Sequence, residues 1–318
     1  MKPIGGYFEL ADREQGEFIH KHGVLLNTGR NALEWILLSL GKARKVYLPY
    51  YTCDVVLEPL KRQNISWQFY RINERLEVDE EVCLGKDEYI IVNNYYGIKD
   101  AYIDQIVAKY GSKIIVDCAQ AFFAPVLPGM KMFYSPRKFV GVADGGIAYG
   151  VTSSLTELEE DVSYLHSAHL FIRKELGAEE GFASYRKDED CLDNQKVKRI
   201  SSFTEDILNH IDYQEIVRKR RVNYQILEEA LDSSNLLTLP TFESFNAPMA
   251  YPYMVENGAV LRKKLIANKV FVPRFWPNEC IPNAIVGGKN LSETILPLPI
   301  DQRYGEEEME RIVQVIKR

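Results

Sequence analysis

The chain has 318 residues, 46% of them apolar, and a formal net charge of −6. The length predicts about two domains, and the acidic balance argues against a nucleic-acid-binding protein. No stretch approaches the roughly 18 apolar residues of a membrane helix, and the N-terminus lacks the apolar core of a signal peptide. The five cysteines form an odd set without C-x-x-C spacing, which favours reduced thiols. We therefore expect a soluble, cytoplasmic protein that binds neither membrane nor nucleic acid.

The first predicted helix follows a patternless start. Residues 1–23 are expected to form an N-terminal arm. Apolar residues at helical spacing then predict a helix over 31–40, and the Thr28–Gly29 turn opens it. Backbone N–H groups at the start of a helix lack partners within the helix, so such a turn is suited to bind an anion.

Short apolar runs alternate with helices over the next hundred residues. Strands are expected at 45–49, 66–71, 88–94 and 113–117, and helices at 55–63 and 102–110. This alternation predicts a mainly parallel sheet in an α/β domain, where ligands bind outside the carboxyl ends of the strands. Four side chains fall at or just after predicted strand ends: Thr28, Tyr51, Tyr95 and Asp117.

The stretch from Phe133 to Gly146 carries one lysine, Lys138, on a short turn. Pro136 prevents a regular helix or a central strand there, and the glycines that follow allow a ligand to approach closely. Two interpretations remain open from this stretch alone. Lys138 and Asp117 share a ligand site, or they are a solvated loop lysine and a strand-end cap.

After residue 150 the pattern changes to a mostly helical one. Helical spacing covers 203–231, and a polar stretch of open role covers 177–194. Beyond it we expect strands at 235–240, 249–255 and 270–273, an extended edge at 296–299, and helices at 261–268 and 306–317. The predicted division is an arm (1–23), a large α/β domain (24–205) and a smaller C-terminal α+β domain (206–318).

Three other motifs favour ordinary structural roles. His166-x-x-His169 would place two imidazoles on one helical face, but nothing nearby supplies a third ligand, so no metal site is expected. The Gly-rich segment 141–150 is not a dinucleotide-binding fingerprint, and Gly287-Gly288-Lys289 is not a P-loop. The basic cluster Arg218-Lys-Arg-Arg221 is expected to be a solvated helix face.

The order of these features resembles that of fold-type-I pyridoxal-phosphate (PLP) enzymes, and most of all the DegT-type sugar aminotransferases. Thr28-Gly-Arg-Asn-Ala-Leu33 is similar to that family's phosphate turn, and Leu48-Pro-Tyr-Tyr-Thr-Cys53 to its Pro-x-x-Thr segment. Further similar segments are Val92–Asp100, Val116-Asp-Cys-Ala-Gln120, the lysine stretch Phe133–Gly146 and the terminal Ile295-Leu-Pro-Leu-Pro-Ile300.

The resemblance implies the fold-type-I architecture, with a large mainly parallel sheet domain and a smaller α+β domain. It also implies site roles. Lys138 would form the Schiff base with PLP and shuttle a proton, and Asp117 would keep the pyridine nitrogen protonated. Gln120 would lie near the phenolic oxygen. The phosphate would be held by backbone groups of Thr28, Gly29 and Arg30, together with Ser135.

The chain departs from the family's pattern at three site positions. Phe133 stands at the family's serine place, so Ser135 is expected to serve instead. Arg30 replaces a small threonine in the phosphate turn and would add a direct charge. Cys53 stands where an aromatic residue is usual, which leaves three candidates for stacking on the cofactor ring: Tyr51, Tyr95 and Tyr96.

The function implied is an aminotransferase that acts on a keto-sugar, expected to be nucleotide-linked, with glutamate as the amino donor. Such enzymes serve amino-sugar and surface-polysaccharide biosynthesis, and a homodimer is expected. Three alternatives stay open: a regulatory or non-catalytic PLP-binding homologue, another PLP enzyme such as a lyase or dehydratase, and an α/β nucleotide-binding protein without PLP.

Overall fold

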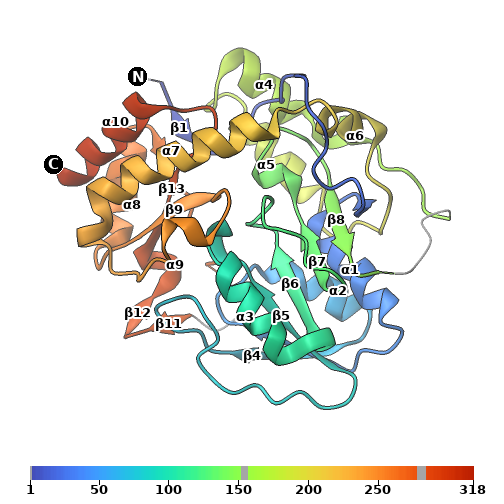
Figure 1. Cartoon of the computed structure of the whole chain (residues 1–318). Helices are drawn as coiled ribbons and strands as arrows, with labels where there is room; N and C mark the ends of the chain where they lie inside the picture. The colour runs from blue at the N-terminus through green and yellow to red at the C-terminus, as the bar shows by residue number, and fades with distance from the viewer. Residues whose placement is uncertain (1, 152–156, 278–283) are drawn as a thin grey trace.

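The computed structural model describes residues 2–151, 157–277 and 284–318. Seven strands form its main sheet in the order β2-β8-β7-β6-β5-β3-β4 (Figure 1). They are β2 (Val24–Leu26), β3 (Lys45–Pro49), β4 (Ser66–Tyr70), β5 (Glu88–Asn93), β6 (Ile114–Cys118), β7 (Lys131–Tyr134) and β8 (Gly146–Tyr149). All run in one direction except β8, which is antiparallel to both neighbours. The predicted mainly parallel sheet is confirmed.

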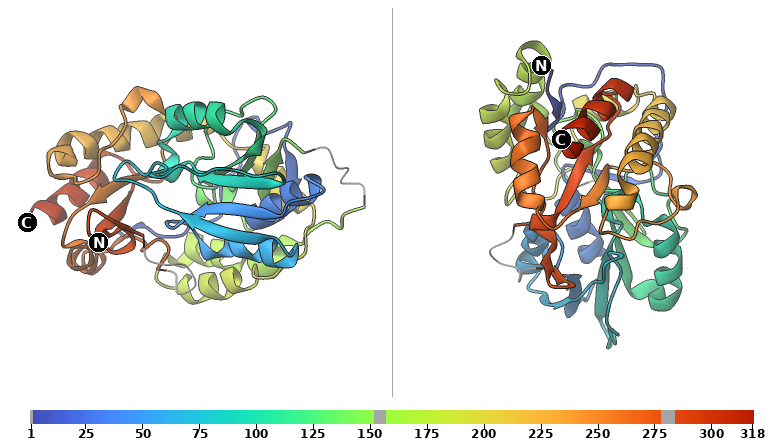
Figure 2. Two further views of the ribbon diagram at one scale, coloured as in Figure 1. Left: turned by 90° about the horizontal axis from the view of Figure 1, so that it is seen from below. Right: turned by 90° about the vertical axis from the view of Figure 1, so that its left-hand side faces the viewer.

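Helices cover both faces of this sheet (Figure 2, left view). They include α1 (Gly29–Ser39), α2 (Leu57–Arg62) and α3 (Asp100–Tyr110). Because side chains alternate along a strand, neighbouring residues belong to different apolar cores. Ile91 and Ile115 pack in the core that α1 and α2 cover, whereas Ile90 and Ile114 pack in the core on the α3 side. The sheet therefore has an α1 face and an α3 face.

The C-terminal part is a second α+β unit, at the left of Figure 1. Its antiparallel pair is β9 (Ala250–Met254) with β13 (Ile295–Pro299), and its helices are α7 (Tyr213–Leu231), α8 (Gly258–Ala267), α9 (Leu291–Thr294) and α10 (Glu306–Lys317). Two short pairs complete it: β1 (Ile4–Gly5) with β10 (Val270–Phe271), and β11 (Ile285–Val286) with β12 (Lys289–Asn290). The exact division into 1–23, 24–205 and 206–318 stays a prediction.

The segment between the two units holds α4 (Ala168–Leu176), α5 (Phe182–Asp190) and α6 (Ser202–Leu208). The predicted polar stretch 177–194 thus contains a helix. Every helix in the described ranges is too short or too polar to cross a membrane.

The strand predicted at 235–240 is wrong. The segment is not in a β-ladder, because the side-chain oxygen of Asn235 accepts from the backbone N–H groups of Met254 and Leu237. A strand partner would otherwise have used those donors.

Buried charges fix the patternless N-terminal arm. Arg303 donates to both carboxylate oxygens of Asp301 (2.7 and 3.0 Å) and to Glu9 Oε2 (2.9 Å). Arg173 donates to the same Glu9 oxygen at 2.9 Å and to the Gly5 carbonyl at 3.0 Å. Ion pairs therefore help to position the arm, together with the β1–β10 pairing and the buried side chains of Ile4 and Phe18.

The basic cluster on α7 is not the solvated face that we expected from the sequence. Arg218 does keep an exposed ion pair with Glu215, but Arg220 is fully buried. Its guanidinium satisfies acceptors in irregular segments, donating to Gln302 and to the carbonyls of Phe139, Pro248 and Met249. Loop carbonyls that lack strand or helix partners need such a donor.

Candidate active site

A cavity of about 200 Å³ opens at the carboxyl ends of the parallel strands. Asn93 is the last residue of β5, Asp117 is the last but one of β6, and Ser135 follows β7. Two-residue alternation places all three on the α1 face, in line with Ile91, Ile115 and Phe133. The predicted site residues on the cavity wall are Thr28, Gly29, Arg30, Asp117, Gln120, Ser135 and Lys138.

Two turns meet at this cavity: the anion turn, residues 28–30, and the lysine turn, residues 135–138. A Cβ added to Gly146 would lie 2.0 Å from the Thr28 carbonyl oxygen, and one added to Gly29 would lie 3.4 Å from Ser135 Cβ. Gly145 N–H donates to the Asn27 carbonyl at 2.6 Å. The glycines after the lysine therefore allow a close approach of backbone to backbone, rather than of a ligand as predicted.

The anion turn opens helix α1. Thr28 caps it, since its Oγ1 accepts from the Asn31 N–H at 3.0 Å. The Arg30 guanidinium donates to Glu58 at 2.6 Å and to Asp193 at 2.8 Å. Its charge is thus paired with two carboxylates. The two carboxylates offset the direct charge expected of the Arg30 side chain, although Arg30 still lines the cavity. The role of its side chain and backbone toward an anion stays a prediction.

Asp117 and Lys138 are placed as the sequence motifs predicted, on one cavity. Asp117 is 9% exposed, and its Oδ1 accepts from the Ala119 N–H at 2.8 Å. Burial raises the pKa of Asp117, while the Lys138 charge and the Ala119 hydrogen bond oppose that rise. Lys138 is exposed at the end of its turn, and its amine has no hydrogen bond or ion pair among the described residues. A free amine thus faces a buried acid.

Buried polar atoms on the wall also lack partners in the part of the chain that the structure describes. They include Gln120 Nε2 and Asn93 Oδ1. The Tyr96 backbone N–H donates to Gln120 Oε1 at 2.9 Å. This bond orients the Gln120 amide, and the NH₂ group of the amide keeps no partner among the described residues. An unpaired buried polar group costs about 1–3 kcal/mol, so unpaired groups beside a cavity indicate a ligand.

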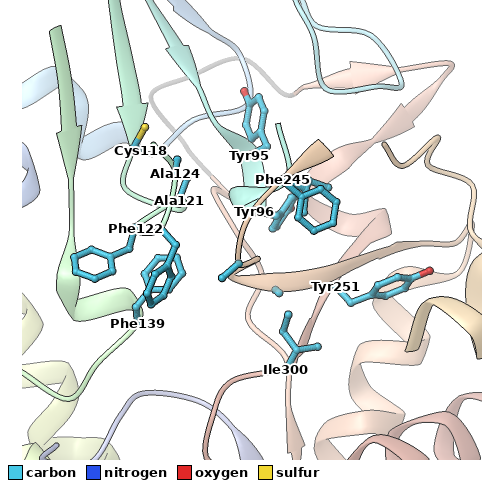
Figure 3. Packing of buried hydrophobic residues seen from close by; sticks show 14 of the residues in the cluster. Tyr95, Tyr96, Cys118, Ala121, Phe122, Ala124, Phe139, Phe245, Tyr251 and Ile300 are labelled. Carbon is cyan, nitrogen blue, oxygen red and sulfur yellow. The ribbon is translucent and has the colours of Figure 1, made fainter. Parts of the chain in front are cut away.

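The three tyrosines proposed to stack on a cofactor ring do not line the cavity. Tyr51, Tyr95 and Tyr96 belong to the core on the α3 side, and Figure 3 shows Tyr96 beside Phe245 there. The Tyr51 and Tyr96 hydroxyls share a 2.7 Å hydrogen bond, and Tyr95 O–H donates to the Tyr51 carbonyl at 2.5 Å. The stacking prediction needs correction, because these strand-end residues turn to the other face of the sheet.

The wall also includes residues that took no part in the predicted site, among them Cys53, Arg137, Glu189 and Trp276. Burial raises the pKa of the Cys53 thiol, against the lowering effect of Lys138. Trp276 meets Tyr51 edge-on at 4.6 Å. Arg137 donates to Glu189 of α5, across 52 residues of sequence. No local sequence pattern indicates a pair so far apart, although Arg137 stands directly before Lys138.

Comparisons with known proteins found similarity in structure only. No family model and no curated protein matches the chain. The putative sugar aminotransferase Spr1654 of Streptococcus pneumoniae, in its apo form, is similar with a TM-score of 0.65 and 15% identity over 98% of this chain and 91% of that one.

Two further solved structures are similar over 93% of this chain. A DegT DnrJ EryC1 StrS aminotransferase from Brucella abortus has a TM-score of 0.64 and 17% identity over 85% of its own chain. DesI, solved in the presence of its TDP-sugar product, has a TM-score of 0.63 and 13% identity over 80% of its chain. The fold class predicted from the sequence motifs is thereby confirmed.

Proposed function

We propose that this chain, which has the fold of the DegT-type sugar aminotransferases, is a PLP-dependent aminotransferase that acts on a nucleotide-linked keto-sugar with glutamate as amino donor. The observation that carries the proposal is that Lys138 and Asp117 line one cavity at the carboxyl edge of the sheet, where the Lys138 charge acts on the pKa of Asp117. The similar proteins support the cofactor and the substrate class, because Spr1654 was also solved in a PMP form and DesI with a TDP-sugar product.

The residues present fit PLP. Lys138 offers an amine to the cofactor's aldehyde, and Asp117 offers an acceptor to the ring nitrogen. The Gln120 NH₂ group, which is buried and unpaired in the described chain, matches the phenolic oxygen. Ser135 and the first turn of α1 suit a phosphate, since hydroxyls and helix N-termini are common phosphate donors.

Asp117 sets the electronics of the site. When bound, PLP supplies an electron sink for the reacting carbon of the substrate. The Asp117 carboxylate would hold the ring nitrogen protonated. Opposite charges about 4 Å apart interact by roughly 4 kcal/mol at an effective dielectric of 20, or about three pKa units. The burial that raises the pKa of Asp117 is then offset by its cationic partner.

Lys138 moves the proton. Its Nζ would take the proton from the substrate carbon and deliver it to C4′ of the cofactor. The amine suits this role because the lysine turn holds it at the cavity without a competing protein partner among the described residues. Leu33, Phe133 and Leu192 line the same cavity and give it an apolar part.

We also propose that the enzyme is a cytoplasmic homodimer that serves amino-sugar or surface-polysaccharide biosynthesis. The 3-10 turn and helices over 163–190 carry exposed apolar side chains, including Tyr164 (76% exposed) and Leu176 (68%). Exposed apolar patches mark interaction surfaces, and two-fold dimers are the commonest assembly. Analytical ultracentrifugation tests this, and a monomer at micromolar concentration would contradict it.

Borohydride reduction of the purified protein with PLP tests the catalytic proposal. Mass spectrometry is expected to find a pyridoxyl group on Lys138, and the Lys138→Ala variant is the matched control. Loss of the cofactor's absorbance on adding glutamate, then its recovery with a nucleotide-linked keto-sugar, would identify the two half-reactions. A wild-type protein without the adduct rules out the proposal. An adduct without any half-reaction favours the regulatory alternative.

A further inference from the structure

Arg137 carries hydrogen-bond donors that the described chain leaves unused at the cavity. A guanidinium has five N–H donors. Arg137 has one side-chain hydrogen bond in the described structure, from its NH₂ group to Glu189, and its Nε is buried without a partner. The side chain is only 18% exposed, so water does not serve all the remaining donors.

Other buried arginines of the chain are better satisfied. Arg303 bonds both oxygens of Asp301, Glu9 and two carbonyls, and Arg220 bonds four acceptors. Arg173 and Arg262 each leave one nitrogen unpaired, but each makes at least two other hydrogen bonds. The deficit at Arg137 therefore marks a place for another acceptor.

The position of Arg137 identifies the chemistry of that acceptor. It lies on the lysine turn between Ser135 and Lys138, and Ser135 packs against Gly29 at the start of α1. A helix start, a hydroxyl and a guanidinium fork together suit a phosphate.

The Glu189 carboxylate is the anion that already contacts Arg137. Its carboxylate lines the cavity and receives the Arg137 hydrogen bond. Burial alone would raise the pKa of Glu189, but the charges of Arg137, His169 and Arg30 bring it below its ordinary value. The Glu189 carboxylate is therefore ionised at neutral pH, and it lines the same cavity as the anion turn.

We propose that Arg137 binds the phosphate group of PLP and that the Glu189 carboxylate competes with this phosphate for the guanidinium. The inference rests on the proposed function. It assigns Glu189, and with it the polar stretch 177–194, a role in setting cofactor affinity, because α5 contributes the competing anion.

Binding of PLP and of pyridoxal, which has the same aldehyde but no phosphate, tests the inference. Dissociation constants would be measured by absorbance titration of the full-length protein. Arg137→Gln is expected to weaken PLP binding roughly tenfold, the usual effect of one charge-assisted hydrogen bond, and to leave pyridoxal unchanged. Glu189→Gln is expected to strengthen PLP binding several-fold, again without an effect on pyridoxal.

Matched controls come from the exposed face of α5. Arg186→Gln and Asp190→Asn neutralise one arginine and one acidic side chain at exposed positions, and neither is expected to alter PLP affinity. Circular-dichroism melting of each variant separates a binding change from unfolding.

The outcomes separate the two proposals. Equal weakening of PLP and pyridoxal by Arg137→Gln would give Arg137 a merely structural role and overturn the inference. Unchanged PLP binding with weaker binding of TDP would assign the guanidinium to a nucleotide diphosphate, and would overturn it too. In both cases a pyridoxyl adduct on wild-type Lys138 leaves the proposed function intact. Absence of that adduct removes the proposed function first.

Discussion

The arm cluster (Glu9, Asp301, Arg303) and the cavity wall differ in how far their polar groups are hydrogen-bonded. In the arm cluster Arg303 forms a two-pronged pair with Asp301 and also bonds Glu9. On the cavity wall, Gln120 and Arg137 each leave a buried nitrogen without a partner in the described chain. The arm cluster is complete in itself and holds the fold together. The wall is incomplete, which is what a binding site requires before its ligand arrives.

The contrast shows where the chain departs from ordinary folding rules. Buried polar groups are nearly always paired, because leaving one unpaired costs about 1–3 kcal/mol. The two large apolar cores on the faces of the sheet offset that cost. A set of unpaired groups gathered at one cavity is therefore evidence of function, in a way that a single exposed lysine is not.

The largest expected effect is in the arm cluster. Arg303→Gln leaves the carboxylate of Asp301 buried without its partner, which typically costs about 3–5 kcal/mol. Arg303 holds the pKa of Asp301 below its ordinary value against the opposing effect of burial. Urea denaturation of the cofactor-free protein measures the loss. Arg137→Gln, under the same conditions, is expected to change stability by less than about 1 kcal/mol. Equal losses in the two variants would break the comparison.

His20 is a second buried group with hydrogen-bond partners, and it makes stability depend on pH. His20 is buried, its Nε2–H donates to the Phe122 carbonyl at 2.8 Å, and its Nδ1 accepts from Tyr149 O–H at 3.1 Å. Burial lowers the pKa of His20 to about 4. The folded state thus favours the neutral ring. The resulting stability is present above the ordinary pKa of 6.5 and is lost as pH falls towards 4.

That loss amounts to about 3 kcal/mol. Unfolding free energies between pH 7 and pH 4 would show it as a slope in the wild type. The His20→Gln variant should have a flatter profile, and an unchanged slope in this variant would count against the assignment.

Tyr96→Phe tests the correction made to the stacking residues. The change removes one of two hydroxyls that bond each other behind the wall, leaving the Tyr51 hydroxyl unpaired. A loss of about 1–2 kcal/mol in stability is expected, with PLP affinity unchanged. A marked fall in affinity with normal stability would restore Tyr96 to the cofactor site.

The smallest expected effect is a gain in stability, from the substitution Asp117→Asn. Burial raises the pKa of Asp117, so its proton is held more tightly in the folded state. The stability it contributes is present at low pH and is lost as pH rises through the raised pKa. Asp117→Asn should therefore melt slightly higher than the wild type at neutral pH without cofactor, and equally at acid pH. The same variant is expected to lose aminotransferase activity. Lower melting at neutral pH would contradict the electrostatic argument.

Much of the fold could be predicted where periodicity is strong. The strands β3 and β5 and the helix α10 lie within a residue of the positions predicted from apolar spacing. Asp117 was expected at the carboxyl edge because parallel strands deliver their end residues there, whereas Lys138 was singled out by the resemblance of its turn to the family's lysine motif. Both line the cavity, and their catalytic roles stay predictions. The sequence set no bounds for the short strands β2, β7 and β8, because three or four residues are too few to show a periodicity, and β2 pairs only with the distant β8.

The sequence predicted that the site lies at the carboxyl edge of the sheet, but not which face of the sheet each side chain occupies. Tyr95 and Tyr96 follow β5 as predicted, yet the chain turns there through a left-handed residue, Tyr96 at φ 56°, and carries their rings away from the cavity. Arg137 and Glu189 could not be paired because nothing local links them. The buried Arg220 was missed because its acceptors are loop carbonyls, which sequence patterns do not reveal.

Strand β8 has a consequence for the order in which the site is built. Within the main sheet, β2 pairs only with β8, and Val24 lies opposite Ala148. Contacts between such distant parts of a chain form late, since a long loop must close first. During synthesis, the strand β6 that carries Asp117 and its neighbour β5 are therefore expected to be present before β8 can pair with β2 ahead of α1. A chain that stops before residue 146 would lack β8, the strand that joins β2 to the rest of the sheet.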